Sequence, residues 1–328
     1  MAKRHRRRRH WGRTLLLIVF AAAAIYAGLH CWYRAPDLQP EETSTPDADV
    51  AASSNIQADT EDPGVSRLER QEKFFTILLS GVDDSNGGSD TNILLGFDAV
   101  QGRIHGVSIP RDTKAIIDGK AHKINYAYNV GGTDKLAEVL SDQLGIPVDY
   151  TVTVDLQGFI DLVNAIGGVD FYVPINMDYD DPLQNLSIHY SAGMQHLNGQ
   201  QAMEVVRFRQ NNDGTGYGTQ DIGRMETQQN FLKAVAKQTL TLSNVDKVGQ
   251  FAKIFRDYVD TELTVGELAW LGTEALKMGT ENISFSTLST DWRDRYIYVD
   301  PEEALALVNE YLNPYVEDRT LEDLNIPD

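Results

Sequence analysis

The sequence predicts an α/β fold: an α/β/α three-layer core with a mixed central sheet, preceded by one N-terminal transmembrane helix. Short apolar runs typical of buried strands alternate with amphipathic helical segments through residues 73–318, and this alternation predicts a mixed sheet covered by helices on both faces. An arginine-rich start followed by an uncharged apolar run predicts the transmembrane helix. A stretch rich in proline and acidic residues separates the two.

The N-terminal region has the charge pattern of a signal-anchor. Residues 1–13 form a basic tail, and residues 14–33 are uncharged, with Trp32 and Tyr33 at the far end, where interfacial aromatic residues are common. Crossing a bilayer core takes about 20 residues. The positive cluster predicts a cytoplasmic N-terminus with the bulk of the chain outside the cell. A cleaved signal peptide is the alternative, because Ala21–Ala24 offers small residues for cleavage.

Residues 34–72 are predicted to be a disordered extracellular linker, because they lack apolar periodicity and contain several prolines. Residues 1–34 hold eight of the 29 basic residues and none of the 48 acidic ones, so the remainder has 21 basic against 48 acidic side chains, a net charge of −27. Such a surface repels nucleic acid, which is therefore excluded as a partner. Any phosphate site must be a local cluster of arginines. The single cysteine, Cys31, allows no intramolecular disulfide.

Three consecutive segments have strand character: residues 74–79, 91–97 and 103–109. If they pair as a meander, the loop that carries Asp83 and Asp90 lies at one end of the sheet. The third strand ends there too and brings Arg111 beside the carboxylates. Carboxylates that hold a hard cation, beside an arginine that binds phosphate in a bidentate manner, are what phosphoryl transfer requires. The alternative is that these acidic residues are ordinary solvated turn formers.

The rest of residues 73–318 continues the alternation. Helices are expected near residues 134–144, 156–166, 222–240, 245–258 and 266–278 and from Pro301, and strands near 150–154, 169–173, 283–288 and 296–299. Residues 319–328 are expected to be a C-terminal tail.

Further arginines occur at two positions suited to anion binding. An extended backbone over residues 205–209 would place Arg207 and Arg209 on one face, whereas a helix would make them diverge. Arg224 lies in the first turn of a predicted helix, with Gln228 one turn further on, and a helix N-terminus favours anions. Each of these arginines, taken alone, is also consistent with an ordinary surface residue.

Eight segments in order resemble the LytR-CpsA-Psr family, and the similarity runs from about Phe74 to Leu240. They are Gly81-Val82-Asp83, Ser89-Asp90-Thr91, Ser108-Ile109-Pro110-Arg111-Asp112-Thr113, Lys123-Ile124-Asn125-Tyr126-Ala127-Tyr128, Gly167-Gly168-Val169-Asp170, Gln195 to Ala202, Arg207-Phe208-Arg209, and Gly223-Arg224 with Gln228. One such motif has little specificity, but eight in register are highly specific.

The resemblance implies a membrane-anchored, Mg²⁺-dependent phosphotransferase of the bacterial cell membrane, with residues 73–318 as the catalytic domain. Such enzymes move a glycopolymer, for example teichoic acid or capsule, from an undecaprenyl-pyrophosphate carrier to a hydroxyl of peptidoglycan N-acetylmuramic acid. By resemblance, Asp83 and Asp90 bind Mg²⁺, with Mn²⁺ as the alternative ion. The implied catalytic residues are Asp83, Asp90 and Arg111. The residues implied to bind pyrophosphate are Arg111, Arg207, Arg209, Arg224 and Gln228.

Two positions depart from the family pattern: Gly88 and Thr227 stand where arginines are frequent, which puts donor affinity or donor identity in doubt. An apolar slot between the sheet and the helices would take the prenyl chain. Its candidate residues are Leu156, Phe159, Ile160, Phe231 and Leu232, whose spacing equally fits plain core.

Two other functions remain open at this point: a prenyl-pyrophosphate phosphatase or pyrophosphatase, in which water replaces the sugar hydroxyl, and a non-catalytic wall-binding or regulatory module. Serine-hydrolase and nucleotide-hydrolase functions are not supported, because the sequence has no Gly-x-Ser-x-Gly elbow and no Walker A loop.

The charge step near residue 34 predicts the topology. Protease added to intact protoplasts should remove nearly all of the chain beyond Tyr33 and leave an N-terminal tag protected. Recovery of a secreted form that starts between residues 25 and 31 would show cleavage instead of anchoring.

Overall fold

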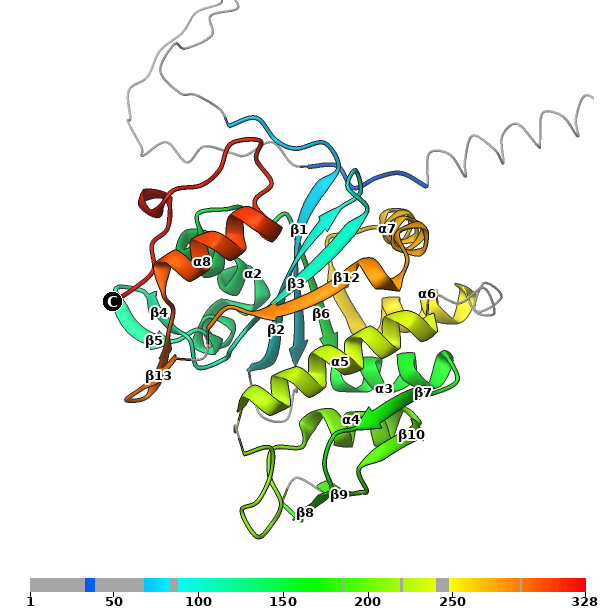
Figure 1. Ribbon diagram of the computed structural model, residues 1–328. Coiled ribbons are helices and arrows are strands. Elements are labelled where there is room, and N and C mark those ends of the chain that lie inside the picture. Colours follow the sequence, from blue (N-terminus) through cyan, green and yellow to red (C-terminus); the bar gives the residue numbers. More distant parts are fainter. Residues whose placement is uncertain are drawn as a thin grey trace, which may run out of the picture.

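A six-stranded mixed sheet forms the centre of the molecule, with the strand order β11-β6-β1-β2-β3-β12 (Figure 1). The computed structural model describes residues 33–38, 68–82, 88–183, 186–218, 221–239, 248–289 and 291–328. The six strands are β1 Phe74–Val82, β2 Ser89–Asp98, β3 Arg103–Ile109, β6 Tyr150–Asp155, β11 Val259–Thr261 and β12 Ile283–Thr287. β1, β2 and β3 pair antiparallel in sequence order, whereas β6 is parallel to β1 and β12 is parallel to β3. The predicted meander and mixed sheet are therefore confirmed.

Helices cover both faces of this sheet, which gives three layers (Figure 1). Because side chains alternate along a strand, Leu78 of β1 packs with α2 (Asn125–Leu144) and α8 (Pro301–Leu307). Its neighbour Ile77 faces the other way and packs with α7 (Val265–Met278). Apolar side chains fill the space between the sheet and the helices on each face. Their burial is therefore the main favourable contribution to the free energy of folding.

A separate apolar cluster lies beyond α5 (Asp221–Thr239), on the side of that helix away from α7 (Figure 1). It is called the second apolar cluster below, to distinguish it from the core on the two faces of the sheet. The other elements that contribute to it are α3 Leu156–Ala165, α4 Gly199–Arg207, β7 Val169–Val173, β8 Met177–Asp181, β9 Leu186–Tyr190 and β10 Gly193–Leu197. The remaining elements are α6 Val248–Tyr258 and the hairpins β4 Lys114–Ile117 with β5 Lys120–Lys123 and β13 Asp291–Arg293 with β14 Tyr296–Tyr298. Sequence patterning missed α4, β8 to β11, β13 and the β4–β5 hairpin.

The extended backbone expected over residues 205–209 is only partly present. α4 continues to Arg207, and the chain becomes extended at Phe208, whose φ and ψ are −59° and 134°. The helical alternative holds for residues 205–207, because Asn198 and Gln201 form a capping box that starts a helix, and that helix buries Val205. α2 also begins earlier than expected, with non-helical backbone at Gly131 and Gly132 inside it.

Both ends of the described chain pack on the domain. Tyr33, Ala35 and Leu38 lie against the cluster on the α7 side, and Leu324 and Ile326 lie against the cluster on the α2 side.

Residues 34–38 belong to the predicted linker, most of which lies outside the described residues. Residues 14–32 of the predicted transmembrane helix also lie outside them. Among the helices that the structure describes, none combines the length and apolarity needed to cross a bilayer.

A buried histidine joins β3 to β12. His105 lies between the hydroxyls of Ser284 and Ser286, at 2.7 Å from Nδ1 and 2.8 Å from Nε2, and its ring stacks on Tyr311 at a centroid distance of 3.6 Å. Burial in this position lowers the pKa of His105 to about 4, chiefly by desolvation of the charged form. The imidazole is therefore neutral in the folded protein near pH 7.

We expect this histidine to make the fold sensitive to acid. Between pH 6.5 and pH 4 the unfolded chain binds this proton more readily than the folded chain, so stability falls as pH falls through that window, by up to about 3 kcal/mol. In urea unfolding at several pH values, His105→Gln should flatten this dependence of stability on pH. An unchanged slope in His105→Gln would contradict the assignment.

Candidate anion-binding active site

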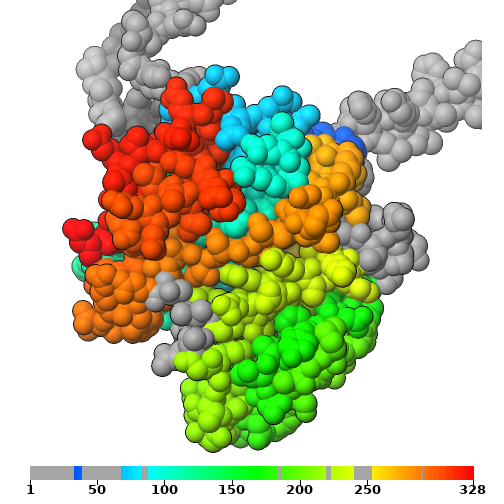
Figure 2. All heavy atoms as spheres, in the orientation of Figure 1, coloured from blue at the N-terminus to red at the C-terminus, as the bar shows by residue number. Residues whose placement is uncertain are grey.

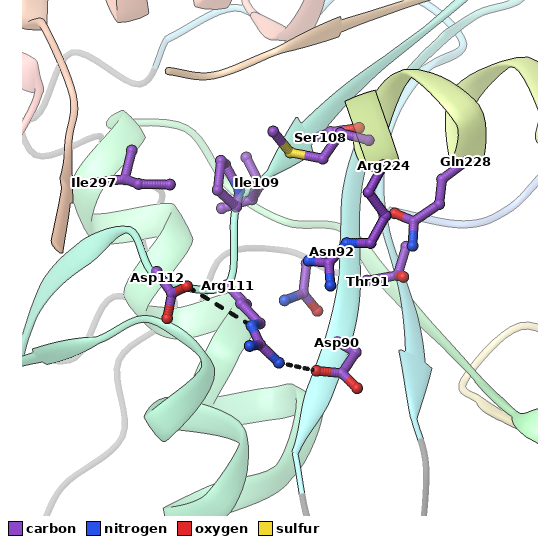
Figure 3. Close-up of a pocket in the computed structure, with 12 residues that line it drawn as sticks. Asp90, Thr91, Asn92, Ser108, Ile109, Arg111, Asp112, Arg224, Gln228 and Ile297 are labelled. Atoms are coloured by element: carbon purple, nitrogen blue, oxygen red, sulfur yellow. Dashed lines mark hydrogen bonds and ion pairs between the residues drawn. The ribbon is translucent and has the colours of Figure 1, made fainter. Parts of the chain in front are cut away.

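A pocket opens at the end of the sheet where β1 and β3 finish and β2 begins (Figure 3). Two layers contribute to it: the strand ends of the meander and one face of α5. Its lining residues are Asp90, Thr91, Asn92, Ser108, Ile109, Pro110, Arg111, Asp112, Arg224, Met225, Gln228 and Ile297. Four of the seven residues singled out from sequence therefore meet here: Asp90, Arg111, Arg224 and Gln228.

Arg111 is held between two carboxylates at the end of β3. Its Nη1 donates to Asp90 Oδ1 at 2.7 Å, and its Nε lies 3.8 Å from Asp112 Oδ2 (Figure 3). Asp112 is only 5% exposed and also receives Lys123 Nζ at 2.6 Å from Oδ1. The two carboxylates fix the direction of the guanidinium, so Arg111 is oriented toward the pocket before any ligand binds.

The face of α5 that lines the pocket is fixed by a glutamine that sequence reasoning missed. Gln229 Nε2 donates to Ser108 Oγ at 3.0 Å and to Thr287 Oγ1 at 3.1 Å, and so ties α5 to the ends of β3 and β12. Arg224 and Gln228 lie one turn apart on the same helix. Arg224 is buried, with 9% of its surface exposed, so its charge is partly desolvated and suited to an anion.

Arg207 and Arg209 do not line the pocket, but their segment is attached to its edge. Gln228 Nε2 donates to Val206 O at 3.1 Å, which holds the end of α4 against α5. Arg207 Nη1 lies 3.9 Å from Met203 Sδ in the preceding turn of α4. Among the described residues, the segment that carries these two arginines therefore lies beside the pocket, and neither arginine is one of the residues that line it.

Asp90 is the one predicted metal ligand that the structure describes, because Asp83 lies outside the described residues. The Asp90 side chain is 53% exposed, and its Oδ1 accepts from Arg111, so Oδ2 is the oxygen suited to a cation. Within the described part of the chain, no three His, Cys, Asp or Glu residues are grouped to hold a metal. The carboxylate at this position is a hard oxygen donor of the kind that Mg²⁺ prefers.

The structure gives a physical reason for both departures from the family pattern. Gly88 has φ +151°, a backbone conformation that side-chain-bearing residues rarely adopt, so an arginine there would be strained. Thr227 is 3% exposed and donates its hydroxyl to Gly223 O at 2.9 Å within α5, so it faces the protein interior.

The residues proposed for the prenyl chain lie mostly in the second apolar cluster. Phe231 is 1% exposed, and its ring lies 5.7 Å from that of Phe159. Leu156 and Ile160 pack against the same cluster. Phe231 is one turn beyond Gln228, so the cluster begins next to the α5 side of the pocket.

A sequence model of the LytR_cpsA_psr family matches residues 42–312. The chain belongs to the LytR-CpsA-Psr family. It is 32% identical over 240 residues to the polyisoprenyl-teichoic acid–peptidoglycan teichoic acid transferase TagV of Bacillus subtilis, covering 70% of this chain and 60% of that protein. It is 34% identical over 214 residues to TagU of Bacillus cereus, covering 64% of this chain and 66% of that protein. The chain therefore spans less than two thirds of the length of these two relatives.

Solved structures agree with the family assignment. The crystal structure of Bacillus subtilis TagV has a TM-score of 0.61 at 28% identity and covers 71% of this chain and 94% of that chain. The protein gbs0355 of Streptococcus agalactiae has a TM-score of 0.62 at 26% identity, covering 72% and 86%. This LytR-CpsA-Psr protein thus shares the fold of its relatives over most of its described length.

If Arg111 is the anion-binding arginine, its removal should weaken binding of a prenyl pyrophosphate by about ten-fold or more, because charge-assisted hydrogen bonds contribute roughly 1.5–3 kcal/mol each. Arg111→Lys should also lose affinity, since a lysine keeps the charge but not the bidentate geometry. Titration calorimetry measures the affinity of each variant for the prenyl pyrophosphate. Arg256→Ala, at an exposed position on α6, is the control. Equal affinities for the two alanine variants would show that Arg111 does not bind the anion.

Proposed function

We propose that this protein is a phosphotransferase that moves a glycopolymer from a polyprenyl-pyrophosphate carrier to a hydroxyl of peptidoglycan N-acetylmuramic acid. It would be anchored in a bacterial cell membrane through residues 14–33, with its catalytic domain outside the cell. The observation that supports this most is the convergence of Arg111, buried Arg224 and Gln228 beside Asp90 in one pocket. The names of the relatives, which are teichoic acid transferases, support the polymer and the acceptor.

The residues of the pocket suit a reaction that depends on positioning and charge. Arg111 and Arg224 would hold the pyrophosphate and neutralise charge in the transition state. The acceptor hydroxyl oxygen attacks the phosphorus that bears the glycan, and the bond from that phosphorus to the bridging oxygen breaks. Prenyl monophosphate leaves with that oxygen, and the hydroxyl proton is released. The product is a phosphodiester between the glycan and the acceptor.

In this proposal a divalent cation acts at the same site. Mg²⁺ held by Asp83 and Asp90, or Mn²⁺ in its place, would supply further positive charge at the pyrophosphate. The pairing of Asp90 with Arg111 at 2.7 Å would keep the carboxylate and the guanidinium on the same side of the pocket, where both can reach one pyrophosphate.

The test is to incubate the full-length protein in detergent with a prenyl-pyrophosphate-linked oligosaccharide, Mg²⁺ and peptidoglycan fragments, and to identify products by mass spectrometry. We expect a phosphodiester-linked glycan on the fragment. Asp90→Ala should abolish Mg²⁺-dependent turnover with little change in the melting temperature, because the Asp90 side chain is half exposed. Asp178→Ala, whose side chain is 82% exposed on β8, should behave as wild type.

Each other outcome has a distinct meaning. Free phosphorylated sugar would identify a hydrolase, and the absence of any turnover would favour a wall-binding module. Full activity in Asp90→Ala would show that Asp90 is not a metal ligand.

A further inference from the structure

The hairpin β13–β14 forms the rim of the pocket on the side away from α5. Ile297 of β14 is 4% exposed and lines the pocket, and its cross-strand partner on β13 is Trp292. Directly paired residues point to the same side of a hairpin, with Cβ atoms about 5 Å apart. Trp292 therefore extends this wall of the pocket outward, and half of its surface (50%) is exposed.

Trp292 is connected to the anion-binding residues by a short series of contacts. Lys123 Nζ lies 5.7 Å from the centroid of the Trp292 ring and 2.6 Å from Asp112 Oδ1. Asp112 in turn contacts Arg111, and its backbone oxygen accepts from Ile297 N at 2.9 Å. The hairpin is thus fixed to the turn that carries the catalytic arginine. β13 lies at the lower left in Figure 1, and in the same orientation Figure 2 shows the orange segment there at the surface of the molecule.

The opposite side of the pocket leads to apolar surroundings. Figure 3 shows Ile297 and Asp112 on one side of Arg111, and Arg224 and Gln228 of α5 on the other. One helical turn beyond Gln228, Phe231 enters the second apolar cluster. If the prenyl chain of the proposed donor lies toward this apolar region, it occupies the α5 side of the pocket, where a polar glycan is disfavoured.

This arrangement assigns a direction to the reaction. In phosphoryl transfer the attacking and leaving oxygens lie roughly in line on opposite sides of the phosphorus. If prenyl phosphate leaves toward α5, the acceptor hydroxyl enters from the hairpin side, past Trp292. We propose that the Trp292 indole is a stacking platform for a pyranose ring of the acceptor peptidoglycan strand. This inference rests on the proposed function.

The chemistry of the rim suits that occupant. The flat, rigid indole offers a large contact area to the C–H face of a sugar at low entropic cost. Lys123, with 40% of its side chain exposed, lies beside the ring and pairs with Asp112, so a cationic group borders the platform where the carboxylates of a stem peptide would lie. A second exposed aromatic residue, Tyr172, is 60% exposed and lies on β7, which pairs with β10 and not with the β13–β14 hairpin. It provides a matched control.

The experiment compares Trp292→Ala, Trp292→Phe and Tyr172→Ala in the full-length protein in detergent. Equilibrium binding of a muramyl-containing disaccharide-peptide is measured first, because it does not require turnover. We expect Trp292→Ala to weaken binding about ten-fold, Trp292→Phe to retain most of the affinity, and Tyr172→Ala to be unchanged. In the transfer assay, Trp292→Ala should raise KM for the fragment and leave the affinity for the lipid-linked donor, measured without acceptor, unaltered.

Several results would overturn the proposal. Loss of donor affinity in Trp292→Ala, with unchanged fragment binding, would place the indole against the donor sugar. If the wild type and the three variants bind the disaccharide-peptide equally, Trp292 is an ordinary surface aromatic residue. Fragment binding that depends on Trp292 without any phosphodiester product would refute transfer while supporting the platform, so the two failures are distinguishable.

Discussion

The register of the β1–β2–β3 meander is the constraint on which the site depends. Asn92 of β2 pairs with Ile109 of β3, so continuing each strand by two residues brings Asp90 opposite Arg111. The 2.7 Å ion pair between them follows from this register. A slip of one residue would turn these side chains to opposite faces of the sheet and separate them. The buried cores on both faces prevent such a slip, because it would also turn side chains such as Leu78 and Leu94 away from the α2 side of the sheet, where they are buried.

An acidic domain can still bind an anion if its cations are concentrated and oriented. The chain carries a net charge of −19, so long-range attraction does not favour phosphate. Arg111 and Arg224 compensate locally: one is oriented by Asp90 and Asp112, and the other is buried on α5. Preorganised charges of this kind stabilise a transition state without a cost of reorientation. The same arrangement explains why Gln229 matters, since it fixes α5, and hence Arg224, relative to the strand ends.

Much of the fold could be predicted because its central strands are short runs that are buried along nearly their whole length. β1 and β3 were expected within a few residues of their observed bounds for this reason. α5 was expected within one residue of its bounds from apolar positions such as Met225 and Val235, both of which the structure buries. α4 was missed because residues 205–209 were considered as an extended segment around the two arginines, although the Asn198–Gln201 capping box upstream is a helix-start pattern that the sequence contains. The β4–β5 and β8–β9 hairpins were missed because β5 and β8 consist mostly of polar and charged residues, whereas the equally short β7, which was predicted, alternates buried apolar with exposed residues.

For the site, the sequence by itself determined the chemical groups and their order: Asp90, Arg111, Arg224 and Gln228 are recognisable from local patterns and from the family resemblance. The tertiary structure decided which of them share a pocket. It brought α5 to the ends of the strands, left Arg207 and Arg209 at the edge, and placed Trp292 across from Ile297. The physical reason is distance along the chain: Trp292 and Arg111 are joined through a hairpin and a buried carboxylate, and no local pattern records contacts between segments so far apart.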